Sequence, residues 1–543
     1  MVMRIRVAGL AVPVGSQEEI DVALRLAVAA RLGVATPTVG EMQVVQRALD
    51  ARRRLRYVCA VDVAVEAALA HRCIAQGKAY LPQPVRHRRL RLRRLPGGPP
   101  PVVVGAGPAG LFAALILAEA GWPPILLERG KPVETRGRDV SRLYRSGELD
   151  PDSNVCFGEG GAGTFSDGKL YTRVNDGRVR AVLTRLVELG AKESILVDNR
   201  PHLGTDRLVV LLKALRAHLR YLGVVVRFGT SLQRCEITAG EMTAAILRDG
   251  ERLETGQLVL ATGHSARDVF AALEEASLRL QARPFAVGFR VEHPQALIDR
   301  MRYGKEARRA CLPAADYRLT HQPKGGGRGV YSFCMCPGGV VVATPTSANA
   351  LCINGMSHAA RDGRFANSAL VVQVAPQDFA TWGHVGDRAG ESFQRAVERD
   401  AYARGGGSFR APAARLTDFL AGRESGDLGA TSYRRGLTPA RLDTLYPPSV
   451  VAALKEAIRS FDRRMRGFLT EQATLIGVET RTASPVRLPR DETLQAVGAR
   501  GLYPAGEGLG YGGGIVSAAV DGMRVAEAML IAQGAEEELL ELA

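Results

Sequence analysis

Three glycines between residues 105 and 110 have the spacing of a dinucleotide-binding turn. The segment reads GAGPAG. In such a turn the first glycine permits a sharp bend, and the second lets the backbone approach a pyrophosphate. The third lets the following helix pack closely on the strand. Because the first N–H groups of that helix have no partners within it, they can bind a negatively charged group. This spacing predicts a nucleotide cofactor.

The residues on either side of the turn support the same interpretation. Residues 102–104 (VVV) predict a buried strand, and the apolar residues up to Ala120 predict a helix. Residues 125–127 (ILL) predict a second strand, which ends at Glu128. An acidic residue at this distance from the first glycine can accept hydrogen bonds from ribose hydroxyls. Strand, turn, helix, strand and acid in this order predict a dinucleotide-binding βαβ unit.

Two further glycine-rich segments could approach a ligand. Residues 501–508 (GLYPAGEG) predict a strand and a turn, and residues 511–516 (YGGGIV) lead into an alanine-rich helix that extends to about Ile531. Residues 154–173 (NVCFGEGGAGTFSDGKLYTR) contain few bulky apolar side chains. A backbone of this kind can lie against a ligand without interference from Cβ atoms. A flexible surface loop is the alternative for residues 154–173.

Two cysteines separated by one residue are the most unusual feature of the region between these segments. Cys334 and Cys336 could form a redox pair or supply a reactive thiolate, since thiol reactivity follows thiolate character. The alternative is a pair of buried, unreactive thiols on a strand. No cysteine or histidine spacing indicates a metal site.

Two arginines and a histidine are further candidates for a site. Arg481 and Arg487 could bind a carboxylate or a phosphate with two hydrogen bonds each, or could pair with neighbouring acidic side chains such as Glu479 and Asp491. His264 could transfer protons, since histidine titrates near neutral pH. A solvated histidine in a turn is the alternative.

The glycine-rich segments together resemble two-domain flavoproteins of the glutathione-reductase type. In that family the chain leaves the FAD domain and returns at its end with an Ala-Gly-Asp/Glu motif, which residues 505–507 (AGE) resemble. Residues 128–130 (ERG) resemble the end of the dinucleotide-binding unit as it occurs in FAD proteins. Residues 258–263 (LVLATG) resemble the strand and Ala-Thr-Gly turn of flavoprotein domains. Over nearly its whole length the chain resembles a bacterial family of uncharacterised FAD-dependent dehydrogenases with a small N-terminal α/β domain.

This resemblance implies noncovalently bound FAD and a set of site residues. Glu507 would contact the ribityl or phosphate part of FAD, and the helix beginning near Gly513 would point its N-terminus at the flavin pyrimidine edge. Lys169 would stabilise the negative charge of a reduced flavin. The residues expected to bind FAD are Gly105, Gly107, Pro108, Ala109, Gly110, Glu128, Arg129, Gly160, Gly161, Ser166, Gly168, Lys169, Thr262, Gly263, Gly506, Glu507, Gly513, Gly514 and Ile515. Those expected to take part in catalysis are Lys169, Cys334, Cys336 and Arg487.

The predicted fold class is α/β. We expect a Rossmann-like FAD-binding domain with an inserted α+β substrate domain and a small N-terminal α/β domain. In the N-terminal domain, residues 4–12 and 57–65 predict strands and residues 19–31 predict a helix. Residues 96–101 (PGGPPP) mark the first boundary. The predicted domains are residues 1–95, residues 96–283 with the return segment 471–543, and the insertion 284–470.

Composition and charge narrow the class of protein. With 46% hydrophobic and 24% charged residues, the chain has the composition of a globular protein. The formal net charge is +16, and the basic residues are densest at 86–94 (RHRRLRLRR). Such a run binds nucleic acid or an anionic surface, or is a solvated face. Eight cysteines without a regular pattern indicate no disulfide framework, and with no membrane-spanning segment expected we predict a cytoplasmic location.

We therefore expect an FAD-dependent oxidoreductase, a dehydrogenase that transfers hydride or electrons between FAD and a small-molecule substrate. No second GxGxxG segment lies between a strand and a helix, so NAD(P)H would bind only transiently. One alternative is an FAD-dependent RNA-modifying enzyme that uses the basic N-terminal domain. A flavin monooxygenase and a non-catalytic flavin-binding protein are the others.

Overall fold

A five-stranded parallel sheet occupies the middle layer of one half of the protein. The structure, a computed structural model, describes residues 2–52, 54–83, 85–324 and 326–542. The strand order is β23-β11-β5-β6-β7, and all neighbouring strands run parallel. The strands are β5 (Val102–Val104), β6 (Ile125–Glu128), β7 (Val225–Phe228), β11 (Leu258–Leu260) and β23 (Leu502–Pro504). Ligands bind beyond the carboxyl ends of the strands in sheets of this kind.

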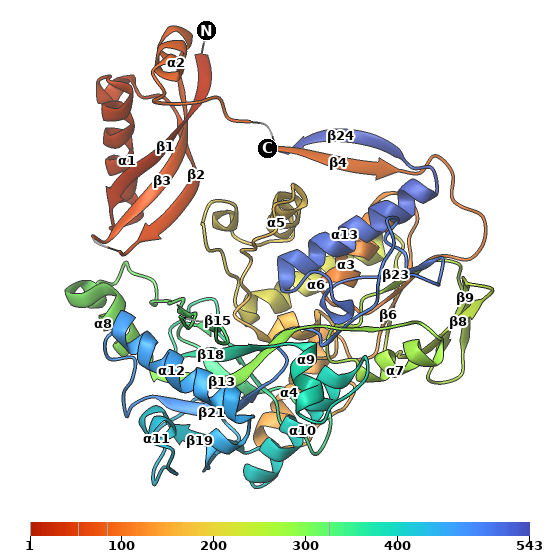
Figure 1. Ribbon diagram of the computed structural model, residues 1–543. Coiled ribbons are helices and arrows are strands. Elements are labelled where there is room, and N and C mark those ends of the chain that lie inside the picture. Colours follow the sequence, from red (N-terminus) through yellow and green to blue (C-terminus); the bar gives the residue numbers. More distant parts are fainter. Residues whose placement is uncertain (1, 53, 84, 325, 543) are drawn as a thin grey trace.

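Two layers cover this sheet, and alternate residues of its strands face one or the other. Val103 packs with helices α3 (Pro108–Glu119), α6 (Thr205–Tyr221) and α13 (Ile515–Ala532). Val102 and Val104 face the opposite side. That side holds the antiparallel strands β8 (Leu232–Thr238), β9 (Glu241–Leu247) and β10 (Arg252–Glu254) and helix α7 (Arg267–Glu275). Helices α3 and α13 lie side by side (Figure 1), so their N-termini approach the same edge of the sheet.

Two more helices flank the segments that lead from β6 to α6. Helix α4 (Val133–Ser146) follows β6 and contacts α6. Helix α5 (Arg178–Glu188) packs against α13.

The second half of the molecule is a cap built on a seven-stranded mixed sheet (Figure 1). The strand order is β14-β15-β18-β13-β21-β19-β20. These strands are β13 (Phe285–Pro294), β14 (Thr320–His321), β15 (Val330–Cys336), β18 (Phe365–Val374), β19 (Ala411–Arg415), β20 (Leu437–Pro439) and β21 (Thr474–Glu479). A hairpin of β16 (Val340–Ala343) and β17 (Ile353–Met356) packs beside it.

Amphipathic helices cover the cap sheet. Helix α12 (Pro448–Arg464) buries Val450, Leu454, Ala457 and Phe461, a spacing that places one apolar stripe against the strands. The other helices of the cap are α8 (Gln295–Tyr303), α9 (Pro376–Thr381), α10 (Ala389–Arg404) and α11 (Leu416–Ala421).

The predicted start of the return segment at residue 471 needs correction. Strand β21 pairs with β13 and β19 and therefore belongs to the cap sheet. The chain crosses between the two halves at the pair formed by β12 (Gln281–Ala282) and β22 (Val486–Arg487). A short buried strand has the same sequence pattern in either sheet, so residue types alone did not place this boundary.

The N-terminal unit is a three-stranded antiparallel sheet with two helices. Strands β1 (Val2–Pro13) and β3 (Arg56–Glu66) and helix α1 (Gln17–Leu32) form where the sequence predicted them, and β2 (Met42–Asp50) pairs with β3. Helix α2 (Ala67–Ala75) follows β3. Ser16 and Glu19 form a capping box that fixes the start of α1. The unit stands beside the two larger halves (Figure 1).

The basic run lies outside this N-terminal sheet, so the predicted boundary at residue 95 is also corrected. Strand β4 (Val85–Arg91) pairs antiparallel with β24 (Glu536–Leu542). The register places Glu536 opposite Arg91 and Glu538 opposite Arg89, and Arg93 forms an ion pair with Glu536 at 2.7 Å. Opposite charges on facing positions stabilise a strand pair. The acidic C-terminal strand therefore offsets charge that the nucleic-acid hypothesis assigned to a free basic surface.

None of the helices in the described residues is both long and apolar enough to cross a membrane.

Candidate functional site

A cavity of about 260 Å³ opens at the carboxyl end of the parallel sheet and extends to the wall of the cap. Its lining includes most of the residues expected to bind the cofactor: Gly105, Gly107, Pro108, Ala109, Glu128, Arg129, Gly161, Ser166, Gly168, Lys169, Thr262, Gly263, Gly506, Glu507, Gly514 and Ile515. Cys334 and Cys336 also line it, whereas Gly110, Gly160, Gly513 and Arg487 do not. Tertiary structure thus brings several segments distant in sequence to one cavity.

The glycines of the first turn have different roles. Gly105 has φ +105°, and a Cβ there would collide with the carbonyl of Ala261. A Cβ on Gly110 would collide with the carbonyl oxygen of Gly105, so Gly110 sets the approach of α3 to β5. At Gly107 the nearest atom to an added Cβ would be 3.9 Å away. Gly107 therefore leaves space that a ligand can fill, at the N-cap of a helix with no side-chain cap.

The substitution Gly107→Ala should separate cofactor binding from folding. Alanine is compatible with φ −79° and ψ 179° at this position, and its methyl group would not collide with the protein. We expect FAD affinity to fall about 10- to 100-fold, the effect of inserting one methyl group into a tight contact. FAD titration and urea unfolding of the FAD-free protein measure the two effects. The control Gly137→Ala, in open space on α4, should retain FAD; equal affinity in both variants would contradict the assignment.

Glu128, the last residue of β6, is hydrogen-bonded to the glycine turn that follows β5. Its buried carboxylate accepts hydrogen bonds from the backbone N–H groups of Ala106 at 2.8 Å and of Gly130 and Gly158 at 2.9 Å. A carboxylate has about four acceptor positions, so one remains for a ribose hydroxyl. Arg129 stacks over the ring of Phe157 at 4.4 Å. The acid thus joins the glycine turn to the loop at 154–173.

The loop at 154–173 is a packed part of the site. Arg136, which is fully buried, donates to the carbonyls of Asn154, Val155, Gly158, Glu159 and Gly161 and to the Thr164 hydroxyl, at 2.6–3.2 Å. The N–H of Gly160 donates to the carbonyl of Ala106 at 2.7 Å. Gly160 therefore fastens the loop to the first turn without lining the cavity. The sequence prediction missed Arg136, which lies on the charged helix α4.

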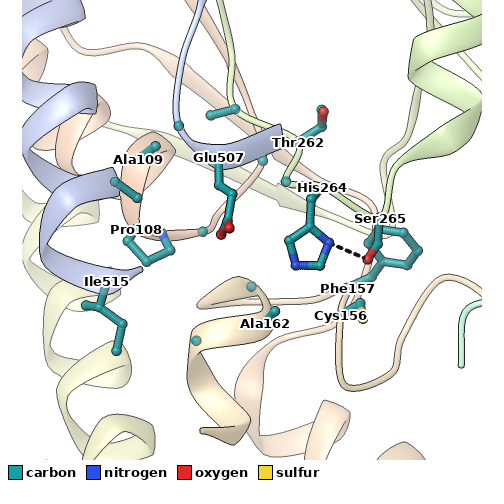
Figure 2. A pocket seen from close by; sticks show the side chains of 18 of the residues that line it. Pro108, Ala109, Cys156, Phe157, Ala162, Thr262, His264, Ser265, Glu507 and Ile515 are labelled. Atoms are coloured by element: carbon teal, nitrogen blue, oxygen red, sulfur yellow. Dashed lines mark hydrogen bonds between the residues drawn. The ribbon is translucent and has the colours of Figure 1, made fainter. Parts of the chain in front are cut away.

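The second turn brings a carboxyl group into the cavity. Figure 2 shows Glu507 and His264 projecting into the same space above Ala162. Burial raises the pKa of Glu507 to about 7, and the Gly514 N–H and Arg283 oppose this effect only in part. Gly514 has φ +80°, and a Cβ there would have no atom within 4 Å. Gly513 lies behind it, against Glu507.

The raised pKa of Glu507 predicts a pH dependence of stability in the FAD-free protein. The folded state binds more protons than the unfolded state between the ordinary carboxyl pKa of 4.5 and about 7, so this stabilisation is complete below pH 4.5 and lost as the pH rises through 7. Between pH 5 and pH 8 the free energy of unfolding of the wild type should therefore fall relative to that of Glu507→Gln by up to about 3 kcal/mol. Urea unfolding at both values measures this difference. The exposed control Glu492→Gln should show none; identical pH profiles for wild type and Glu507→Gln would refute the assignment.

The turn after β11 contributes the hydroxyl of Thr262 and the uncharged ring of His264. Thr262 Oγ1 is buried and has no hydrogen-bond partner among the described residues. A buried polar atom without a partner is costly unless a ligand or water satisfies it. His264 Nδ1 lies 3.0 Å from the Ser265 hydroxyl. Burial and the nearby Arg481 and Arg267 lower the pKa of His264 to about 4, so this ring is uncharged at neutral pH.

A β-bulge turns Cys334 into the cavity. Between Phe333 and Cys336 the register of β15 with β18 shifts by one residue, and Cys334 has φ +46°. A non-glycine residue in this region of backbone space is uncommon, and such bulges often redirect a side chain near a site. The Cys334 side chain is exposed to the cavity, but the surrounding protein desolvates its thiol and raises the thiol pKa. Burial raises the pKa of Cys336 to about 11. Both thiols are therefore protonated at neutral pH, which disfavours the predicted reactive thiolate.

Lys169 supplies a fixed positive charge beside these thiols. Its ammonium group donates to the carbonyl of Met335 and lies 3.3 Å from the carboxylate of Asp167. Burial alone would lower the pKa of Lys169, but Cys336 and Asp167 raise it above the usual value. Asp167 also accepts hydrogen bonds from Arg361 and Ser357. The lysine is thus charged and held in position, with about 19% of its side chain exposed.

A buried ion pair supports the bulge from within the cap. Arg290, with no exposed surface, donates to both carboxylate oxygens of Glu479 at 2.8 and 2.9 Å. It also donates to the carbonyl of Cys334 at 3.2 Å and to the side-chain oxygens of Asn354 and Asn367. The sequence prediction did not include Arg290, whose partner lies 189 residues away.

Of the two arginines considered as anion ligands, the structure brings Arg481 to the cavity. Arg481 pairs with Glu398 at 2.8 Å, and not with the predicted Glu479 or Asp491. Arg487 is exposed on β22 and stacks over Tyr511 at 4.7 Å, outside the cavity lining. The position of Arg487 therefore does not support the expected role of this residue in catalysis.

The cavity fits a dinucleotide with a flavin ring. It offers two helix N-termini without side-chain caps, a glycine surface at Gly107, Gly263 and Gly514, and the unpaired hydroxyl of Thr262. These features suit a pyrophosphate and a polyhydroxyl chain. Cys334 of the cap and Lys169 of the loop at 154–173 complete the lining of the cavity.

Comparisons with known proteins agree with this fit. Residues 284–482 match a family model described as "FAD-dependent protein, C-terminal domain-like". An uncharacterized protein of Clostridium beijerinckii is 46% identical over 429 residues, which cover 79% of this chain and 80% of that protein.

Two solved structures are also similar, at 13% and 10% sequence identity. One is a geranylgeranyl bacteriochlorophyll reductase-like protein from Thermoplasma acidophilum, with a TM-score of 0.36 over 80% of this chain and 79% of that chain. The other is the glycerol-3-phosphate dehydrogenase of Bacillus halodurans complexed with FAD, with a TM-score of 0.34 over 81% and 66%. Similarity at this level indicates no substrate. The Clostridium relative and the matched model show that the chain belongs to the family of FAD-dependent proteins with this C-terminal domain, and that FAD is its cofactor.

Proposed function

We propose that the protein is an FAD-dependent oxidoreductase of the dehydrogenase type, with a two-domain arrangement like that of the glutathione-reductase class. The observation that carries this proposal is the single cavity shared by the two halves. The cofactor-binding turns and Lys169 line it from one half, and Cys334 and Cys336 line it from the cap. A substrate that enters between them would lie against the cofactor and the cap at once. Bound FAD supplies the group that accepts or donates hydride or electrons.

The residues that line this cavity would orient a small-molecule substrate and stabilise negative charge. The Lys169 ammonium, held by Met335 and Asp167, would favour charge that develops beside it in a site with little water. The protonated thiols of Cys334 and Cys336 would form a weakly polar surface next to the aromatic ring of Phe333. His264 is neutral and can accept or donate a hydrogen bond at neutral pH. NAD(P)H is a candidate for a transient co-substrate in the same cavity.

An absorbance spectrum of the purified protein, followed anaerobically as NADH or NADPH is added, tests this proposal. Flavin bands that bleach with either nucleotide would support a nicotinamide-linked half-reaction. If they persist, a panel of small alcohols, amines and hydroxy acids extends the test to other donors. A flavin that no donor reduces and no acceptor reoxidises would contradict the proposal and favour a non-catalytic role.

Lys169→Met should slow reduction of the flavin while FAD stays bound. Loss of one fixed charge at a developing negative charge lowers rates by about 100-fold or more. Stopped-flow absorbance with the donor found above measures the rate, and the flavin-to-protein ratio measures FAD content. The exposed Lys213→Met on α6 serves as the control and should reduce at the wild-type rate. If Lys169→Met is reduced as fast as this control, Lys169 has no part in the reaction.

A further inference from the structure

A second cavity, of about 200 Å³, lies between the cap and α4, and none of the described residues that line it lines the flavin cavity. It is bounded by the β16–β17 hairpin, by His358 just after this hairpin, by Tyr144 near the end of α4 and by residues 432–435. Strand β16 contributes its whole length, Val340–Ala343, and β17 contributes Met356. The walls are therefore mainly apolar. A cavity of about 150 Å³ is large enough to hold benzene, so this one can hold a single ring with a substituent.

Two polar side chains in the lining of this cavity lack partners among the described residues. The Tyr144 hydroxyl is buried and has no hydrogen-bond partner in the described part of the chain. Arg434 is exposed at the cavity and forms no hydrogen bond or ion pair with any described residue. Tyr144 and Arg434 line the same cavity. This mainly apolar cavity therefore has a hydroxyl and a positive charge in its lining.

The remaining polar groups at the cavity do not cancel this charge. Arg435 donates to the backbone carbonyls of Arg145 and Ser408 and has no carboxylate partner among the described residues. The Tyr433 hydroxyl donates to the carbonyl of Phe409, and His358 Nδ1 lies 3.8 Å from a carboxylate oxygen of Asp206. The Ser432 hydroxyl is engaged by Val341 N–H and Glu292. None of the described residues that line the cavity is acidic. The cavity therefore favours an anion over a cation or a neutral molecule.

We propose that this cavity binds a small monocarboxylate with an apolar body, of the size of benzoate or hexanoate. The carboxylate would pair with Arg434 and accept a hydrogen bond from the Tyr144 hydroxyl, while the apolar body contacts the valines of β16 and Met356. A guanidinium is well suited to a carboxylate because it offers parallel N–H donors. The proposal goes beyond the oxidoreductase activity, because its ligand does not touch the flavin cavity.

Binding is tested on the FAD-loaded protein with benzoate and hexanoate, and with benzyl alcohol and hexanol as uncharged counterparts. Calorimetry measures the affinities, and the labelled methyl signal of Met356 in a carbon-13 NMR spectrum reports the location. We expect millimolar binding of the carboxylates, at least about tenfold tighter than the alcohols. The Met356 signal should shift with the same midpoint.

Two substitutions isolate the polar groups. Arg434→Gln should remove the preference for the carboxylates over the alcohols. Tyr144→Phe should lower the affinity for every ligand about fivefold, since it removes only one hydroxyl. Arg459→Gln and Tyr221→Phe, on exposed side chains elsewhere, are the matched controls and should bind as the wild type does.

Three results would overturn the proposal. One is the absence of carboxylate binding at 20 mM, roughly the upper limit for a millimolar site. Another is affinity unchanged by both Arg434→Gln and Tyr144→Phe. The third is a ligand that perturbs the flavin bands but not Met356, which would place it in the flavin cavity. Failure of this proposal leaves the oxidoreductase proposal intact, because flavin reduction is measured without these ligands.

Discussion

Replacing Arg136 with alanine is expected to lower the free energy of unfolding by at least about 3 kcal/mol and to leave the protein without FAD. The guanidinium donates to five carbonyls and one hydroxyl of the loop that forms one side of the flavin cavity. Its removal leaves buried acceptors unsatisfied and opens a cavity. Arg136→Lys should recover little, because an ammonium group has three donors and no planar fork.

The measurements are urea unfolding and the flavin-to-protein ratio after purification. Arg138→Ala, an exposed position on the same helix, is the control and should change stability by no more than about 0.5 kcal/mol. Wild-type flavin content in Arg136→Ala, with a loss below about 1 kcal/mol, would show that the loop holds its shape without the arginine.

Glu398→Gln is expected to cost about 3–5 kcal/mol of stability, because it leaves two buried guanidinium groups without their common counter-charge. The Glu398 carboxylate, with no exposed surface, accepts from Arg267 at 3.0 and 3.1 Å and from Arg481 at 2.8 Å. It also accepts from the Thr480 hydroxyl at 2.7 Å. Since Arg481 lines the flavin cavity, FAD affinity should fall as well.

The same group predicts sensitivity to acid. Burial alone would raise the pKa of Glu398, but Arg481 and Arg267 lower it to about 2. A lowered pKa contributes stability that is present above the ordinary carboxyl pKa and lost as the pH falls toward 2. Glu398→Gln should lack this part of the acid transition. The control is Asp400→Asn, which removes the half-exposed ion pair with Arg404 on the same helix and should lower the free energy of unfolding by less than about 1 kcal/mol. An equal loss of stability in both variants would show that Glu398 and its two buried arginines stabilise the protein no more than a surface ion pair does.

The cofactor motif was predictable because its parts are contiguous. The strand, glycine turn, helix and second strand at 102–128 fold as one unit, and a side chain at Gly105 or Gly110 would collide with neighbouring backbone. The capped helix and the two strands of the N-terminal unit were also predictable from local periodicity.

The supporting groups of the site were not predictable from local patterns. Arg290 and Glu479 lie 189 residues apart, and Arg267 and Glu398 lie 131 residues apart. A charged residue in a helix or strand normally indicates a solvated position. Only the fold shows that these side chains are buried and paired. For the same reason the sequence did not show that Arg481 faces the cavity and Arg487 does not, since nearby residues on one segment can face opposite sides.

The amino-acid sequence by itself determined the cofactor class and the order of the segments that bind it, since glycine spacing and hydrophobic period are local properties of the chain. Tertiary structure alone decided that strand β21 joins the cap sheet, that the basic strand β4 pairs with the acidic β24, and that Cys334 faces the flavin cavity on a bulge. Each of these depends on hydrogen bonds or ion pairs between segments far apart in sequence. Such contacts form only when the whole chain has folded, because their partners are specified by position in space.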